Sequence, residues 1–289
     1  MAQSTTVLKP ITALGNDLFD KVEKQNIRYI NLSQSELKNF NFSREEGPMK
    51  GFGKNTLVYL PDDNDDGGEE NVVVNGSCSK LFLDGGLSFM APYDFQAKKI
   101  VLGSTFDLGQ TTTLYLPFAL TAQQAAEAGS FRIFDRIQGD KAIFRRLSIV
   151  DGTEANVPYV FIPDVDAIQL DDIAIKGCST AATGTFVGTF EQITFDKDQS
   201  DIYLLNEGTN MFVQAKSGDV LPSFKAYLKS ETSGAELRMV VDDGAVGIDG
   251  IHEATADSDA WYTVDGQRLS GHPAKAGLYI HNGEKVLLR

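Results

Sequence analysis

Short stretches of alternating apolar and polar residues run through most of the chain, separated by Gly, Asn and Asp dipeptides. Alternation with period two predicts β-strands that are buried on one face. From residue 99 onward the expected strands are 99–102, 112–116, 131–137, 142–149, 159–162, 186–190, 202–205, 212–215, 224–228 and 237–241. So many short strands predict an all-β fold, with an antiparallel β-sandwich-like body in which two sheets bury their apolar faces.

Local turn and cap signals add detail to this body. The dipeptides at 139–140 and 207–208 predict hairpin turns between neighbouring strands. One helix interrupts the strands, with Thr121 as N-cap, Gln124 completing a capping box, and Gly129 ending the helix.

The N-terminal part has shorter elements. Strands are expected at 27–32, 56–60, 72–74 and 81–83. Their spacing is typical of a solenoid-like ladder, or of the start of a sandwich. A short helix beginning at Asn16 or Asp17 and a helical turn within 35–40 are also expected.

The C-terminal part predicts a separate β-meander. Asp265-Gly266 and Asn282-Gly283 are type I′ turn dipeptides, the first between 261–264 and 267–269 and the second between 278–281 and 284–288. The chain therefore divides into an N-terminal β-rich segment that could cap a solenoid, a sandwich-like domain, a Gly- and Asp-rich linker and a tail. These parts are residues 1–98, 99–242, 243–258 and 259–289. The tail either caps the last sheet edge or acts as a sorting signal.

The order of residues in the tail is more specific than its turns. An aromatic pair, D-G-Q-R-L, a spacer with proline, G-L-Y-I, N-G and K-V follow one another from Trp261. Six further stretches are NVVVNGSC at 71–78, PYDFQA at 92–97, TLYLPF at 113–118, PYVF at 158–161, FVGTF at 186–190 and SFKAYL at 223–228. Together they resemble a large family of exported, surface-associated proteins of Bacteroidetes, whose members often carry leucine-rich repeats. The resemblance implies export to the cell surface or the extracellular space, and it carries over no catalytic residue.

The composition of the chain argues against some classes of binding partner. The chain has 289 residues and a net charge of −14, which argues against nucleic acid because phosphate binding needs clustered Lys and Arg. No apolar run approaches the length of a membrane span, and the first residues form no signal peptide. We therefore expect a protein that does not span a membrane and from which any leader has been removed.

Cysteine and histidine limit the chemistry. Cys78 and Cys178 are far apart in the chain, and we expect two buried free thiols instead of a disulfide. The three histidines all fall in the last forty residues, which argues against a catalytic triad or zinc site on the body. We expect a non-enzymatic protein with no catalytic residue. A carbohydrate-active enzyme with paired carboxylates is the alternative, since the chain has 40 Asp and Glu.

An acidic loop at 62–70 is the strongest candidate metal site. It matches the first half of a D-x-[DN]-x-[DN]-G calcium loop through Asp62, Asn64, Asp66 and Gly67. Val73 occupies the twelfth position, where the motif needs a bidentate Glu, so Glu69 or Glu70 would have to substitute. The expectation is weak calcium binding at most and no other cofactor. A calcium-dependent binding module and a solvated acidic loop are the two interpretations.

Exposed aromatics are the remaining candidates. Trp261, Tyr262 and Tyr93 could stack on sugar rings, or they could pack within the sheets. The sequence thus predicts an adhesin-like or glycan-contacting module, whose partner is a host or dietary glycan or a surface protein.

Overall fold

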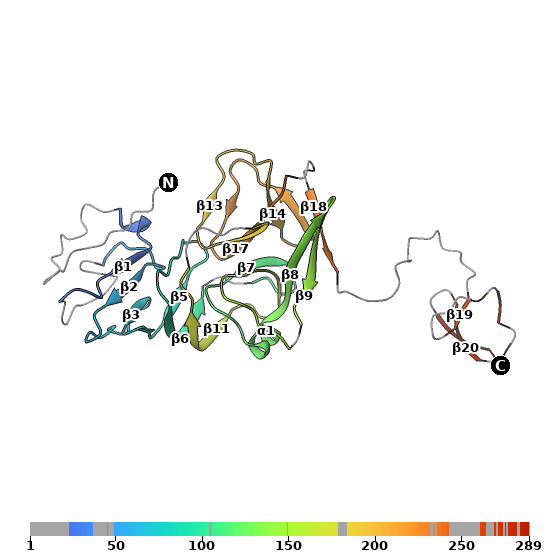
Figure 1. Cartoon of the computed structure of the whole chain (residues 1–289), viewed down its shortest axis with the longest axis horizontal. Helices are drawn as coiled ribbons and strands as arrows, with labels where there is room; N and C mark the ends of the chain where they lie inside the picture. The colour runs from blue at the N-terminus through green and yellow to red at the C-terminus, as the bar shows by residue number, and fades with distance from the viewer. Residues whose placement is uncertain are drawn as a thin grey trace. The chain divides into compact units, whose positions relative to one another are not determined.

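The computed structural model describes residues 23–36, 45, 49–103, 106–148, 150–178, 184–231, 234, 236–242, 261–263, 269, 271–273, 275, 277–281 and 284–288. In these residues nearly all regular structure is β-strand, which confirms the all-β prediction (Figure 1). None of the helices found there has the length and apolar character needed to cross a membrane.

The elements follow the chain in this order: η1 Lys24–Asn26, β1 Tyr29–Asn31, β2 Leu57–Leu60, β3 Val72–Val74, β4 Ser77–Cys78, β5 Leu81–Leu83, β6 Phe95–Leu102, β7 Thr112–Tyr115, α1 Ala122–Ala128, β8 Gly129–Gln138, β9 Lys141–Arg146, β10 Pro158–Pro163, β11 Gln169–Ile175, β12 Phe186–Thr189, β13 Ile193–Thr194, β14 Ile202–Asn206, β15 Met211–Gln214, β16 Val220–Leu221, β17 Lys225–Lys229, β18 Glu236–Val241, β19 Trp261–Thr263, β20 Gly277–His281 and β21 Glu284–Leu288.

The first sheet has the order β1-β2-β3-β4-β6-β11, and β5 also pairs with β6. Its first three strands run parallel, with Val58 in register between Ile30 and Val72. These three side chains lie in a small core of their own. Parallel short strands stacked in register are the arrangement of a solenoid ladder, one of the two interpretations that the strand spacing left open.

A buried asparagine connects the turns of this ladder. Asn71 has φ 61 and is fully buried. Its Nδ2 donates to the carbonyls of Lys54 and Phe82, while its Oδ1 accepts the N–H of Phe82 at 2.7 Å. Because buried backbone groups need partners, this one side chain stabilises loops that the short strands cannot pair.

The second sheet has nine strands in the order β12-β17-β14-β15-β18-β9-β8-β10-β7. It rolls until its edge strand β7 meets β17, where the Tyr115 N–H donates to the Phe224 carbonyl at 2.8 Å. Gly188 of β12 lies against Tyr115, since a Cβ built there would be 2.2 Å from the ring. A side chain at residue 188 would hold the two ends of the rolled sheet apart.

One pairing in this sheet departs from the antiparallel expectation. β9 and β18 are parallel neighbours, with Arg238 opposite Lys141. The chain reaches β18 only after building β10 to β17, so the connection is a long crossover, and such crossovers permit parallel pairing. The local turn pattern that predicted the hairpins contains no information about this contact.

The main core lies between the two sheets. It joins Phe95 and Ile100 of β6 to Phe131 of β8 and Phe161 of β10. A second core fills the rolled sheet around Phe144 and other apolar side chains. The boundary expected between residues 98 and 99 falls inside β6, and residues on both sides of it contribute to the main core.

The tail forms the predicted meander, with β19, β20 and β21 as antiparallel neighbours in sequence order. The chain divides into two compact units between Asp243 and Gly244. β19 pairs with β20 instead of with 267–269, and a single hydrogen bond joins the Leu269 N–H to the Trp261 carbonyl. Several expected features lie outside the described residues. They are the two turn dipeptides of the tail, the linker, the helix expected to begin at 16 or 17, and residues 37–40 of the expected helical turn.

Both cysteines are free and buried, as predicted. Burial raises the pKa of Cys78 and of Cys178 to about 12. Neither thiol is therefore ionised at neutral pH, and both behave as small apolar side chains.

Candidate ligand-binding site

Tyr93 is the exposed aromatic side chain among those the sequence singled out. It lies in the turn before β6, and 53% of its surface is accessible. The ring makes a T-shaped contact with the buried Tyr59, with centroids 5.5 Å apart and planes at 90°. The ring is thus in contact with the core and also open to solvent.

The amide of Asn31 stands beside this ring. Its Nδ2 donates to the Tyr93 hydroxyl at 3.3 Å. Its Oδ1 accepts both the N–H and the hydroxyl of Ser33, at 3.0 and 2.7 Å, which fixes the amide orientation. The donor side of Asn31 therefore faces Tyr93. The sequence reasoning missed Asn31 because the parallel pairing of β1 with β2, which brings it near the turn of Tyr93, is not visible in local alternation.

The turn that carries Tyr93 is held in place by its neighbour Asp94. The Asp94 carboxylate accepts the Gly177 N–H at 2.7 Å and the Lys176 ammonium at 2.8 Å. The Gly177 N–H, followed by Lys176, lowers the pKa of Asp94 below its usual range. A bridge between Ala91 and Cys178 fixes the other side of the turn. An exposed ring on a fixed backbone loses little conformational freedom when a ligand stacks on it.

We call Tyr93 and Asn31 together the tyrosine platform. A flat aromatic face attracts the C–H face of a sugar ring by dispersion and apolar contact, and an adjacent amide can bond a sugar hydroxyl. The exposed ring and the oriented amide are thus suited to stacking against a ligand and to hydrogen bonding with it.

The other two aromatic candidates lie in the tail unit. Trp261 is only 8% exposed, and its ring stacks on His281 at 4.2 Å with planes at 12°. His272 contacts another part of the same ring, with centroids 4.6 Å apart. Tyr262 is half-buried in β19, opposite Ile280. The indole therefore packs within the meander and leaves little surface for a sugar.

Several carboxylates of the acidic loop between β2 and β3 already have hydrogen-bond or ion-pair partners within the protein. The carboxylates of Asp65 and Asp66 accept the N–H groups of Gly67 and Gly68 at 3.1 and 2.9 Å. Glu70, one proposed substitute ligand, pairs with Lys80. Partial burial acts to raise the pKa of Asp66, but bonds from Ser79 and Gly68 outweigh it and lower that pKa.

The remaining candidate ligands in this loop are less constrained. Asn64 turns back to the Pro61 carbonyl, and Asp62 is exposed. Among the residues that the structure describes, no three His, Cys, Asp or Glu side chains form a group suited to a metal ion. Weak calcium binding at this loop stays a prediction.

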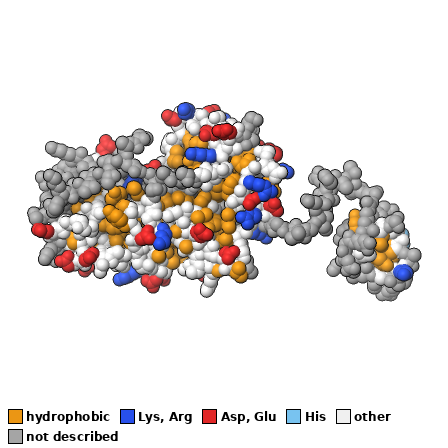
Figure 2. All heavy atoms as spheres, viewed as in Figure 1, with side chains coloured by type: hydrophobic (Ala, Val, Ile, Leu, Met, Phe, Trp, Pro, Cys, Tyr) orange, Lys and Arg blue, Asp and Glu red, His pale blue; other side chains and the backbone are white. Residues whose placement is uncertain are grey.

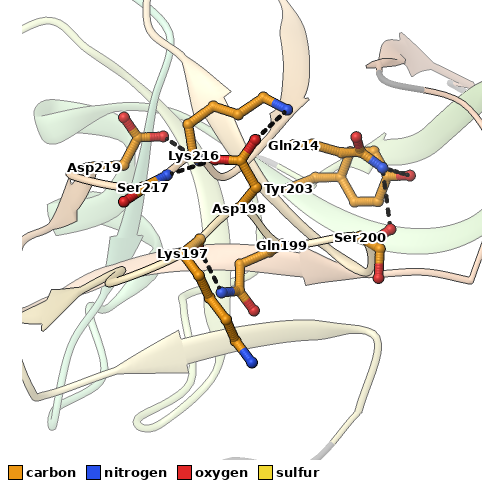
Figure 3. Close-up of polar contacts among 9 residues, drawn as sticks. All are labelled: Lys197, Asp198, Gln199, Ser200, Tyr203, Gln214, Lys216, Ser217 and Asp219. Atoms are coloured by element: carbon orange, nitrogen blue, oxygen red, sulfur yellow. Dashed lines mark hydrogen bonds and ion pairs between the residues drawn. The ribbon is translucent and has the colours of Figure 1, made fainter.

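A second polar cluster joins the loop before β14 to the loop after β15 (Figure 3). Asp198 accepts the Ser217 N–H at 2.9 Å and the Lys216 ammonium at 3.4 Å. Asp219 accepts the Lys216 N–H at 2.8 Å. The Ser217 N–H, with Lys216, keeps the pKa of Asp198 below its usual range. These side chains bind one another and the backbone, so the cluster stabilises two loops.

A third cluster lies where the rolled sheet closes. Lys225 of β17 donates to Glu207 at 2.8 Å and to the hydroxyl of Thr112 in β7, which in turn donates to Glu207. Nearby, Thr111 donates to the side chain of Asn210 at 3.0 Å. Each member has a partner in this ring of contacts, so its role is to join β7, β17 and the β14–β15 turn.

Comparisons with known protein families, with curated proteins and with solved structures find no match to this chain.

Proposed function

We propose that this chain is a non-enzymatic, exported module that contacts glycans at the cell surface. The observation that carries the proposal is the tyrosine platform: Tyr93 is 53% exposed, supported by Tyr59 and flanked by Asn31. An exposed aromatic ring on a fixed backbone, with an amide beside it, presents the apolar face and the hydrogen-bonding group that a sugar ring needs. The place of the module outside the cell rests on the resemblance of its tail and body to exported surface proteins.

A glycan array tests the proposal. The chain should bind a subset of host or dietary glycans, and Tyr93→Ala should remove the signal because it removes the stacking surface. Leu108→Ala is the matched control, since Leu108 is 63% exposed outside the platform. Glycans incubated with the protein should be recovered intact. Cleavage of the bound glycan, or equal signals from wild type and Tyr93→Ala, would contradict the proposal.

A further inference from the structure

Two cations face each other across neighbouring strands of an acidic protein. Arg238 of β18 lies directly opposite Lys141 of β9, and both side chains are exposed. The chain has 40 acidic residues and only 26 Lys and Arg, so a cation in a strand is more often expected opposite an acidic residue than opposite another cation. Like charges directly opposite in a sheet are destabilising, which makes this pair costly unless an anion lies between them.

Neither cation of this pair is neutralised within the part of the chain that the structure describes. Arg136 has ion pairs with Asp135 and Asp242, and Arg145 also pairs with Asp135 at 3.2 Å. In the same described residues, Lys141 and Arg238 form no ion pair. Figure 2 shows Lys and Arg side chains gathered, among a few Asp and Glu, at the end of the body where β8, β9 and β18 lie.

A groove runs beside the pair. Its volume is about 420 Å³, within the usual range for small-ligand sites. Ile143 and Val240 are register partners in its floor, and Arg136 lies on the far side of Ile143. Gln138, opposite Lys141, adds an amide to the rim.

Asp140 and Asp242 also line the groove, and Asp242 pairs with Arg136. Lys141 lies in the lining, and Arg238 is its register partner beside the groove. The groove therefore has an apolar floor, an amide on its rim, and at one end the two cations that no carboxylate among the described residues pairs with.

We propose that this groove, named here the β9–β18 groove, binds a carboxylate-bearing saccharide. The carboxylate of the sugar lies between Lys141 and Arg238, and the C–H face of its ring rests on Ile143 and Val240. Gln138 bonds a ring hydroxyl. A long, densely charged polyanion such as DNA is a poor fit, because the protein as a whole carries −14 and Arg136 is already paired.

Calorimetric titration with oligogalacturonate tests this assignment, with an uncharged galactose oligomer of the same length as the comparison ligand. Wild type should bind the charged oligomer, and binding should weaken as salt is raised. The double variant Lys141→Ala/Arg238→Ala should weaken binding about tenfold or more, since it removes two charged contacts. The double variant should not melt below wild type, because it removes a repulsive pair.

Three further proteins complete the test. Lys141→Arg/Arg238→Lys keeps both charges and should retain binding. Lys99→Ala/Lys197→Ala removes two exposed cations elsewhere and should also bind as wild type. Tyr93→Ala should leave oligogalacturonate binding intact, so that this site and the tyrosine platform succeed or fail separately. No binding by wild type, equal binding of the uncharged oligomer, tighter binding of duplex DNA, or an equal loss in the Lys99/Lys197 variant would overturn the proposal.

Discussion

A single carboxylate, Glu207 of the β14–β15 turn, links that turn to β7 and β17 at the closure of the rolled sheet. Its partial burial acts to raise its pKa, but Lys225 and the Thr112 hydroxyl outweigh that effect and lower it. A group with a lowered folded pKa stabilises the fold above its unfolded pKa, and that stability is lost as pH falls through the folded value.

We therefore expect Glu207→Gln to lower stability at neutral pH by less than about 1 kcal/mol, since 48% of the Glu207 side chain is exposed. The difference from wild type should shrink as pH falls below about 4.3, the usual unfolded value for Glu. Urea unfolding of both proteins between pH 7 and pH 3 measures it. A difference that grows toward acid pH would contradict this role.

The residues of the acidic loop at 62–70 predict weak binding of calcium. Val73 replaces the twelfth-position carboxylate, and Asp66 and Glu70 already have partners. Calorimetry with calcium chloride should give a dissociation constant no tighter than about 0.1 mM. A sub-micromolar site that is lost in Asp62→Ala/Asp66→Ala would refute this and favour a calcium-dependent module.

At the scale of elements, helix α1 shows how local sequence determines structure. Thr121 accepts the Gln124 N–H, and the Gln124 side chain accepts the Thr121 N–H, so the predicted capping box is confirmed. Thr121→Ala should cost about 1 kcal/mol. For a unit of this size the melting temperature should fall by about 2–4 °C in a thermal scan. Thr121→Ser keeps the acceptor and should melt as wild type; an equal loss in both would assign the effect to packing.

Hairpins were predictable for the same reason as the helix. The turns at 139–140 and 207–208 connect β8 to β9 and β14 to β15, because their dipeptides specify the backbone locally. β11 was missed, since Asp171 and Asp172 interrupt its apolar pattern and Asp172 adopts φ 54. Pairings such as β9 with β18 depend on contacts between distant segments, which alternation does not encode.

The candidate sites also contain residues that the sequence could identify and residues that only the fold brings together. Tyr93 could be named from its residue type, but Asn31 joins it only through the fold. The β9–β18 groove was not predictable, because Lys141 and Arg238 become neighbours through a parallel crossover. Trp261 shows the converse: its residue type indicated a platform, and stacking on His281 buries it.

At the scale of the whole molecule, the chain is two compact units divided between Asp243 and Gly244. In the part of the chain that the structure describes, the hydrophobic cores of the first unit are built from that unit's own residues. A chain ending at Ser258 should therefore keep the melting temperature of the full protein to within about 4 °C. Differential scanning calorimetry of the two chains measures it. Unfolding of the shortened chain would show that the tail belongs to the body, and would favour the capping role over sorting.

Glycan contact at the tyrosine platform is the central claim, and one titration tests it most directly. The glycan with the strongest array signal is titrated into wild type, Tyr93→Phe and Tyr93→Ala. The phenylalanine variant keeps the stacking face and loses only the hydroxyl bonded to Asn31, so its Kd should rise less than tenfold. The alanine variant should weaken binding by about tenfold or more, as for truncation of a Tyr at the centre of an interface. Equal Kd values for wild type and Tyr93→Ala would contradict the account.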